Sequence, residues 1–259
     1  MTAVPEHITI LTGASRGMGL AMAHQLLAPD RLLLCISRQQ NPALTEAAAQ
    51  KGAPLLQWSQ DLAATLEVAL RLQDWLNTLE TTRLNSVTLI NNAGVIPPIG
   101  PLDNCPPEAL ANALRVGLEA PMQLTAAFLR ATGAWVEGGW QGQRKVLNIS
   151  SGLGRHPMAA QAPYCAAKAG MDHFTRCSAL DEAQRPHGAK LVSLAPGVID
   201  TDMQTQLRAG DPARFPDLGR FVGLKAQGQL TSPEVAATQV LAWLARKDFG
   251  TAPVADVRD

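Results

Sequence analysis

The sequence predicts one α/β domain built on a doubly wound parallel β-sheet with helices on both faces. Three observations support this fold class. Short β-rich runs alternate with longer segments of helical periodicity, no repeat or composition shift divides the chain, and a glycine-rich turn follows the first run. With 259 residues, 46% of them hydrophobic, one domain of residues 1–259 can bury a sizeable core.

The expected strands and helices follow one another in order along the chain. The strands are expected at 7–11, 31–36, 55–58, 86–90, 145–149 and 190–194, and the helices at 17–28, 42–51, 63–79, 107–131, 162–183 and 232–245. The last helix has the clearest start. Thr231 and Ser232 offer a cap, Pro233 is an early proline, and Glu234 is an acid that reaches back to the cap.

The stretch before this last helix differs from the other connections. Residues 207–230 are dense in Gly, Pro and charged residues and resemble a linker. A loop this long inside a compact domain usually has a function, so we expect a substrate lid over 202–230.

Charge and cysteine content disfavour several classes of protein. Because 22 basic residues balance 22 acidic ones, we expect no binding to nucleic acid or to anionic membranes. Five scattered histidines and four separated cysteines (Cys35, Cys105, Cys165 and Cys177) show no ligand or redox spacing, so no metal site is expected. The N-terminus lacks a signal-peptide pattern, and no window approaches 18 uninterrupted apolar residues. We therefore expect a cytoplasmic protein.

The first strand runs into a glycine-rich turn that opens the first helix. It reads Thr12, Gly13, Ala14, Ser15, Arg16, Gly17, Met18, Gly19. Gly13 permits the tight turn, Gly17 lets the backbone approach a pyrophosphate, and Gly19 lets the helix pack close to the sheet. The spacing is G-x3-G-x-G, so the turn alone also fits an ordinary strand–helix connection. Together with the motifs downstream, it predicts a Rossmann-type dinucleotide site.

The end of the second strand indicates which nucleotide is bound. An acidic residue there would bind the adenosine ribose of NAD, whereas a basic residue would accept the 2′-phosphate of NADP. Here Ser37 and Arg38 end the strand, and Arg16 adds a second guanidinium from the glycine turn. This favours NADP. The alternative is that both arginines are solvated surface charges.

The chain's only tyrosine, Tyr164, precedes Lys168 by one helical turn, so both side chains share a helix face. A nearby ammonium is expected to lower the tyrosine pKa, which makes the phenol an acid for a carbonyl oxygen that is accepting hydride. Ser151 ends a predicted strand and is expected to donate a hydrogen bond to the same oxygen. Such a Tyr–Lys pair also occurs on solvated helix faces. Its combination with the serine and the glycine turn predicts reduction of a small carbonyl substrate, or the reverse oxidation of an alcohol.

With these motifs, nearly the whole chain resembles the short-chain dehydrogenase/reductase family. The resemblance is carried by TGASRGMG at 12–19, Asp61 with Leu62, NNAG at 91–94, Ser151, YCAAK at 164–168 and PGVIDT at 196–201. It implies catalysis by Ser151, Tyr164 and Lys168, with Lys168 also bound to the nicotinamide ribose. It implies further cofactor contacts at Asp61, Leu62, Asn92, Ala93, Gly94, Pro196, Gly197, Val198 and Thr201. Asp61 and Leu62 would meet the adenine, and Val198 and Thr201 would hold the carboxamide.

Simpler interpretations of some of these residues remain open. Asp61 or Thr201 caps the helical segment that follows it, or Asn91 and Asn92 only stabilise a turn. Substrate contacts are expected at Ser151, Leu153, Met158, Tyr164 and Met203. Met158, Leu153, Met203, Phe215 and Phe221 are candidates for an apolar pocket, although such residues usually serve core packing. His156 either lies near the substrate or faces solvent.

Within this family, PGVIDTDM, its LAPGV context and SPEVAA look most like the sepiapterin reductase and benzil reductase branch. This resemblance implies NADPH-dependent reduction of a ketone or vicinal dicarbonyl. It also implies a homodimer or homotetramer that pairs through the two long helices, which are rich in alanine and leucine.

One position departs from the family pattern. Family members carry an asparagine on the central helix that holds a water linking the active lysine to solvent, and Gly117 stands there instead. Asn112 lies about 140° away around an ideal helix. Gly117 and the following Pro121 are expected to weaken or bend the helix. Either water or a backbone carbonyl fills the gap in a working enzyme, or the proton relay is impaired and the protein is a nucleotide-binding sensor or scaffold with weak catalysis.

Overall fold

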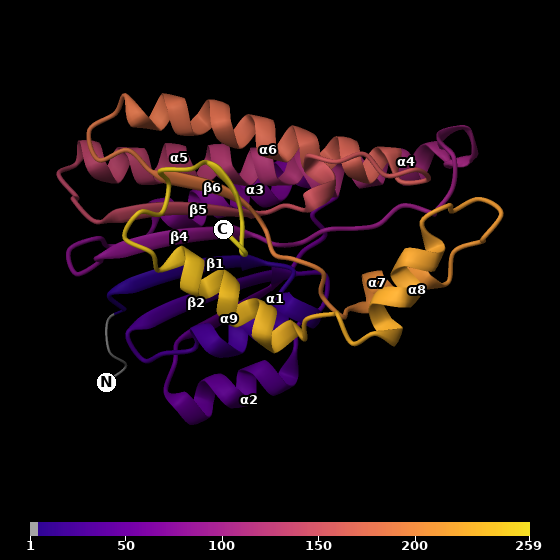
Figure 1. Ribbon diagram of the computed structural model, residues 1–259. Helices are drawn as coiled ribbons and strands as arrows, with labels where there is room; N and C mark the ends of the chain where they lie inside the picture. Colours follow the sequence, from indigo (N-terminus) through magenta and orange to yellow (C-terminus); the bar gives the residue numbers. More distant parts are fainter. Residues whose placement is uncertain (1–4) are drawn as a thin grey trace.

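The computed structural model describes residues 5–259 and contains one seven-stranded sheet (Figure 1). All neighbouring strands are parallel, in the order β3-β2-β1-β4-β5-β6-β7. The strands are β1 His7–Thr12, β2 Arg31–Ser37, β3 Leu55–Ser59, β4 Ser86–Asn91, β5 Gln143–Ile149, β6 Lys190–Ala195 and β7 Val254–Asp256. The predicted fold class is confirmed, and β7 is an addition to the six expected strands.

Helices cover both faces of this sheet, as Figure 1 shows. They are α1 Gly17–Leu26, α2 Pro42–Lys51, α3 Thr65–Asn77, α4 Pro107–Leu114, α5 Ala120–Glu137, α6 Ala162–Ala183, α7 Asp202–Arg208, α8 Leu218–Ala226 and α9 Pro233–Leu244. Helices α1, α2 and α9 pack on one face, and α3, α5 and α6 pack on the other. Within residues 5–259, no helix combines the length and apolar character that a membrane crossing requires.

Both faces of the central strands are apolar because both are covered by helices. Neighbouring residues of a strand point to opposite faces. Ile10 therefore packs in the core beneath α3 and α5, whereas Leu11 packs in the core beneath α1 and α9. Leu34 and Leu33 divide between the same two cores. This double burial produces the continuous apolar runs that predict the strands.

The region expected to be a lid is not an irregular loop. It contains α7 and α8, which lie beyond the carboxyl ends of the strands (Figure 1). These two helices share a small core in which Leu207, Phe215 and Phe221 pack with Met158. The start of α9 agrees with its expected cap, because the Ser232 hydroxyl accepts a hydrogen bond from the Val235 amide at 3.3 Å.

The expected central helix over 107–131 is interrupted by a π-helical turn, η2 Arg115–Glu119, between α4 and α5. The Ala120 amide donates to the Arg115 carbonyl, which lies five residues earlier. Pro121 explains the interruption, because it has no N–H to offer the Gly117 carbonyl four residues before it. The expected weakening of the helix is therefore present, and it takes the form of a π turn.

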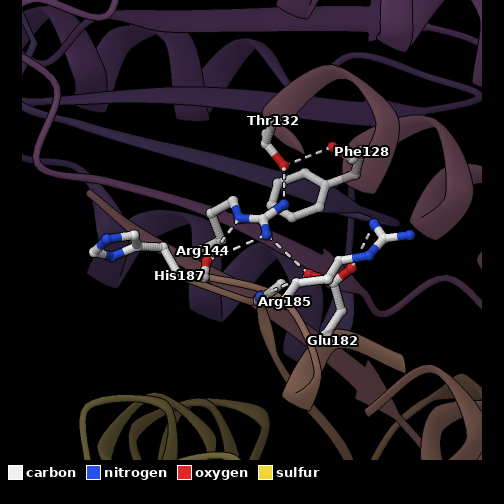
Figure 2. Close-up of polar contacts among 7 residues, drawn as sticks. Phe128, Thr132, Arg144, Glu182, Arg185 and His187 are labelled. Atoms are coloured by element: carbon white, nitrogen blue, oxygen red, sulfur yellow. Dashed lines mark hydrogen bonds and ion pairs between the residues drawn. The ribbon is translucent and has the colours of Figure 1, made fainter. Parts of the chain in front are cut away.

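A buried ion pair joins the last turn of α6 to the start of β5 (Figure 2). Arg144 donates to the Glu182 carboxylate at 2.9 Å, and both side chains are only 2% exposed. Arg144 also donates to the Thr132 hydroxyl and to the His187 carbonyl, while Arg185 donates to Glu182. With these further hydrogen bonds, the pair fixes the end of α6 against α5 and the sheet.

Candidate active site

A cleft of about 960 Å³ lies at the carboxyl ends of the strands. In open parallel sheets, ligands bind at this edge, where the strand order reverses. Its wall brings together every residue predicted for cofactor and substrate. These are Gly13, Ser15, Arg16, Gly17, Met18, Gly19, Ser37, Arg38, Asp61, Leu62, Asn92, Ala93, Gly94, Ser151, Leu153, Met158, Tyr164, Lys168, Pro196, Gly197, Val198, Thr201 and Met203.

Two glycines of the turn after β1, Gly13 and Gly19, have no room for larger side chains. Gly13 and Gly17 have φ angles of +71° and +55°, which favour glycine. A Cβ atom at Gly19 would lie 2.1 Å from the Gly13 carbonyl oxygen, and one at Gly13 would lie 2.9 Å from the Ala93 Cα. The turn is therefore packed tightly against the start of α1 and the segment after β4.

Two glycines of the wall instead leave open space on the side where a Cβ would stand. At Gly17 a Cβ would meet only the Thr201 methyl group, at 3.7 Å. At Gly94 it would meet nothing within 4 Å in the described part of the chain. Such open backbone lets a bound dinucleotide approach closely, so the cradle fits the cofactor that the turn predicts.

Asn92 holds the glycine turn from the neighbouring strand. Its side-chain amide donates to the carbonyls of Thr12 and Gly13, at 3.0 and 3.3 Å. The Thr12 hydroxyl in turn accepts from the Asn92 and Ala93 amides. Asn92 thus stabilises a turn, as one interpretation expects, and it also lines the cleft.

Tyr164, Lys168 and Ser151 meet in the cleft wall. Tyr164 and Lys168 lie one turn apart on α6, and the Lys168 Nζ is 5.8 Å from the centroid of the tyrosine ring. Lys168 is only 4% exposed and donates to the Ile149 carbonyl at 2.7 Å. The Ser151 hydroxyl accepts from the Leu153 amide at 3.1 Å.

The acid–base properties of this group depend mainly on burial. Burial raises the pKa of Tyr164 to about 12, and the nearby Ser151 side chain partly offsets that rise. Burial lowers the pKa of Lys168 to about 8, and the negative charge of Asp172 acts in the opposite direction. The expectation that Lys168 lowers the tyrosine pKa is therefore wrong for this structure, because desolvation of the phenol dominates. The phenol keeps its proton at neutral pH and remains a competent donor.

Comparison with known proteins agrees with this arrangement. Residues 7–212 match the family model described as short chain dehydrogenase. The chain belongs to the short-chain dehydrogenase family. Members of this family are oxidoreductases that use NAD(P).

Two curated relatives and one solved structure are similar to this short-chain dehydrogenase along almost their full length. A Bacillus cereus benzil reductase ((S)-benzoin forming) is 35% identical, over 93% of this chain and 94% of its own. A Xenopus tropicalis sepiapterin reductase is 28% identical, over 90% of this chain and 89% of its own. The crystal structure of a short-chain dehydrogenase/reductase from Burkholderia vietnamiensis is 33% identical with a TM-score of 0.64, covering 98% of this chain and 100% of that one.

Two arginines line the cleft of this short-chain dehydrogenase beside the glycine turn. Arg38 is exposed on the wall, and the Ser37 hydroxyl accepts from the Ala14 amide of the glycine turn at 2.8 Å. Arg16 donates to Asp202 at the start of α7 at 2.9 Å, and both side chains are about two-thirds exposed. This pair connects the glycine turn to α7.

Neither of the two alternative helix caps is formed. The Asp61 carboxylate lines the cleft and accepts from the Ala63 amide at 2.9 Å in the turn before α3, but the cap residue of α3 is Ala64 and no side chain caps this helix. Thr201 is the cap residue of α7, but its side chain makes no capping hydrogen bond. Its hydroxyl is therefore not used in holding that helix.

Apolar side chains gather in one part of the cleft wall. Leu153, Met158 and Met203 line it, together with Leu207 of α7 and Phe221 of α8. Phe215 instead packs between these two helices, stacked on Phe221 with ring centroids 5.6 Å apart. His156 lines the cleft and is exposed, so it faces solvent, as the second interpretation expects.

The π turn brings Gly117 close to the catalytic helix. A Cβ at Gly117 would lie 3.0 Å from the Ala167 Cβ, next to Lys168 in the sequence. An asparagine side chain therefore does not fit without movement of α6. Pro121 leaves the Gly117 carbonyl without its α-helical donor, which favours the alternative in which a backbone carbonyl fills the gap. Asn112 also lines the cleft.

Several site residues escape sequence reasoning. Asn41 caps α2 and donates to the Ser15 carbonyl at 3.1 Å, and the Asn-Pro pair at 41–42 is a cap signal that could reveal it. Asp256 and Arg258 line the cleft as a bidentate pair with contacts of 2.6 and 2.7 Å. No periodic pattern marks this pair, because only the pairing of β7 with β6 brings it to the site.

Proposed function

We propose that this short-chain dehydrogenase is an NADPH-dependent carbonyl reductase that converts a ketone or vicinal dicarbonyl to an alcohol. The observation that carries the proposal is the meeting of Ser151, Tyr164 and Lys168 in one cleft with an open glycine cradle. The apolar substrate end and the similarity to a benzil reductase and a sepiapterin reductase support this substrate class.

The residues at the nucleotide end support NADP over NAD. Arg38 and Arg16 supply positive charge where a 2′-phosphate would lie, and Ser37 adds a hydroxyl. The amides of the glycine turn, at the N-terminus of α1, would hold the pyrophosphate. When bound, NADPH supplies the hydride. The proposed contacts of Asp61 and Leu62 with the adenine complete this end.

In the proposed reaction the carbonyl carbon receives the hydride, and its oxygen receives a proton from the Tyr164 phenol. The Ser151 hydroxyl donates a hydrogen bond to the same oxygen and stabilises the charge that develops there. The Lys168 ammonium donates to the Ile149 carbonyl and to the Met171 Sδ, and its third hydrogen would serve the nicotinamide ribose. The same groups serve the reverse oxidation. Helices α7 and α8 act as the lid that excludes water.

The second candidate is a nucleotide-binding sensor or scaffold with weak catalysis, which the replacement of the family asparagine by Gly117 favours. The two candidates differ in turnover. A panel of diketones, including benzil, together with simple ketones and enoyl thioesters, is tested with NADPH consumption as readout. A reductase turns over at least one ketone or diketone and loses this activity in Tyr164→Phe. Tight NADPH binding without turnover of any carbonyl would establish the sensor instead.

We also propose that the protein forms a homodimer or homotetramer through α5 and α6. These helices lie side by side on one face of the molecule (Figure 1). Met122 of α5 is 45% exposed and Leu180 of α6 is 69% exposed, and the proposed contact would bury these apolar side chains. Light scattering at micromolar concentration is expected to give a dimeric or tetrameric mass. A monomeric mass would contradict the proposal.

For the location of this enzyme we propose the cytoplasm. All four cysteines are free thiols, and Cys177 is exposed. Exposed free thiols suit a reducing compartment. Fractionation of the native host, with the protein detected by antibody, is expected to recover it in the cytoplasmic fraction, and recovery in an extracytoplasmic fraction would contradict this.

A further inference from the structure

A buried carboxylate, Asp172, lies one turn after Lys168 on α6 and takes no part in the chemistry proposed above. It is only 2% exposed. Its Oδ1 accepts hydrogen bonds from the Ser150 hydroxyl at 2.6 Å and from the Ser193 hydroxyl at 2.7 Å. Burying a carboxylate costs free energy unless other groups compensate its charge, so this placement calls for an explanation.

Asp172 and Lys168 together hold the end of β5. Lys168 donates to the carbonyl of Ile149, and Asp172 accepts from the side chain of Ser150. Ile149 and Ser150 are consecutive in the sequence, and Ser151 follows them directly. Two side chains from adjacent turns of α6 thus fix the backbone that presents Ser151 to Tyr164 on the same helix.

The second oxygen of Asp172 has no hydrogen-bond partner among residues 5–259. It faces Gly154, where a Cβ would lie 2.7 Å from this oxygen and 2.9 Å from the Lys168 carbonyl. The close approach of the loop excludes a side chain that would donate to the carboxylate. Two neutral hydroxyls do not neutralise its charge, and the nearest compensation along the helix is the buried ammonium of Lys168.

Other charged groups on the elements packed against α6 are occupied or distant. Glu119 accepts from Thr65, and Arg130 donates to Gln73. Asp256 pairs with Arg155 and Arg258. On β5, Arg144 pairs with Glu182 and Lys145 donates to the Leu244 carbonyl. The remaining ones are exposed: Glu108 on α4, Arg115 on η2, Glu137 on α5 and Lys190 at the start of β6. Within the described chain, Asp172 is the one charged group that raises the pKa of Lys168, against the larger lowering by burial.

We propose that Asp172 is a positioning residue of the reductase: it holds the strand end that carries Ser151 and balances the charge of the Lys168 ammonium. The inference rests on the proposed function for its effect on turnover. Its effect on Lys168 can be measured without substrate or cofactor. Mutations can separate the two roles. The hold on the strand end depends on the hydrogen bond from Ser150, whereas the balance of the Lys168 charge depends on the carboxylate charge.

Three variants test the proposal. Asp172→Asn keeps the shape and the Oδ1 acceptor but removes the charge. Ser150→Ala keeps the charge but removes the link to the strand end. Ser193→Ala is the matched control, since it removes the other hydrogen bond to Oδ1 and leaves both the charge and the link in place. If Asp172→Asn does not fold, Asp172→Ser is the substitute.

The first readout is trace acetylation of Lys168 by acetic anhydride in the cofactor-free protein, followed by peptide mass spectrometry across pH. In Asp172→Asn the labelling midpoint of Lys168 is expected to move down by on the order of one pH unit. It is expected to stay at the wild-type value in Ser150→Ala and Ser193→Ala. An unchanged midpoint in Asp172→Asn would overturn the charge-balancing role, whether or not the variant is less stable.

The second readout is kcat for a carbonyl that the wild-type enzyme reduces with NADPH. Ser150→Ala is expected to lose about tenfold or more in kcat, because small displacements of a reacting group are costly. Ser193→Ala is expected to stay near the wild-type value. Equal kcat in the wild type, Ser150→Ala and Ser193→Ala would overturn the role of Asp172 in holding the strand end that carries Ser151. If the wild type reduces no carbonyl, the proposed function fails, while the labelling midpoints still decide the charge-balancing role.

Discussion

The Lys168 ammonium is hydrogen-bonded to the Ile149 carbonyl at 2.7 Å, two residues before Ser151. The lysine therefore has a structural role. It joins α6, which carries Tyr164, to the end of β5, which leads into Ser151, so that all three groups of the candidate site share one frame. A loss of Lys168 would loosen this frame as well as remove a charge.

Replacing Tyr164 by Phe removes the proton donor and keeps most of the apolar volume. Because general acids contribute about 10²- to 10⁴-fold, the rate of carbonyl reduction is expected to fall at least 100-fold. NADPH affinity, measured by calorimetry, is expected to stay near the wild-type value. If the variant kept more than about a tenth of the wild-type rate on a verified substrate, Tyr164 would not be the acid.

The pH dependence of kcat/KM is expected to follow Lys168. The ammonium form is the active one, and burial lowers its pKa to about 8, so activity should decline as the pH rises beyond that value. The phenol of Tyr164, with its pKa raised to about 12, stays protonated over this range. Initial rates at low substrate concentration report the free enzyme. A plateau that extends to about pH 10, near the ordinary lysine pKa, would contradict this assignment.

Cofactor choice is expected to depend on Arg38. The wild type should bind NADPH at least about tenfold more tightly than NADH, which corresponds to about 1.4 kcal/mol. Arg38→Ala should remove most of this difference by weakening NADPH alone, since NADH has no 2′-phosphate. Asp202→Asn removes the ion pair that holds Arg16, so measuring NADPH affinity in this variant separates the contribution of Arg16 from that of Arg38. Equal affinities of the wild type for both cofactors by calorimetry would rule out the NADP preference.

Introducing the family asparagine at position 117 is expected to harm the protein. The contact of 3.0 Å with the Ala167 Cβ predicts overpacking, which typically lowers the free energy of unfolding by about 1 to 3 kcal/mol. The free energy of unfolding is measured by denaturant for Gly117→Asn, for Ala167→Gly and for the double variant. If the contact with Ala167 causes the loss, Gly117→Asn costs less stability in the Ala167→Gly background than in the wild type. A rise in kcat without loss of stability would instead show that Gly117 impairs the proton relay.

The buried ion pair predicts a large loss of stability in Glu182→Gln. The change leaves the Arg144 charge buried without its partner, so the free energy of unfolding is expected to fall by about 3 to 5 kcal/mol. Arg185→Ala removes the exposed partner of the same carboxylate and should cost less than about 1 kcal/mol. Similar losses in the two variants would mean that burial does not set the strength of the pair.

Much of the fold is predictable from the sequence because buried parallel strands and amphipathic helices leave local patterns. The run at 7–11 needs no tertiary information to be recognised. β7 does need it, since three residues show no periodicity and gain their stability from pairing with β6. The π turn is predictable only in part. Gly117 and Pro121 predict a weak point in the helix, but the geometry of the turn depends on packing against Ala167.

The candidate site divides in the same way. Its glycine turn and the Tyr164–Lys168 pair are local motifs. Asp256 enters through the pairing of β7 with β6, and no spacing rule reveals it. Asp172 follows Lys168 by one helical turn, but its hydrogen bonds with Ser150 and Ser193 come from strands distant in sequence. The wrong direction expected for the Tyr164 pKa has the same origin, because desolvation depends on the folded surroundings of the phenol.

The separate small core beneath α7 and α8 has a consequence for motion. Met158, Leu207, Phe215 and Phe221 form a cluster of their own, apart from the two large cores that flank the sheet. Units with few buried apolar contacts open at a lower free energy than the global unfolding of the protein. Amide hydrogens of α7 and α8 should therefore exchange with solvent faster than those of β1 and β4. With α7 and α8 as the proposed lid, a local opening of these helices would admit substrate while the sheet and the cores that flank it stay folded.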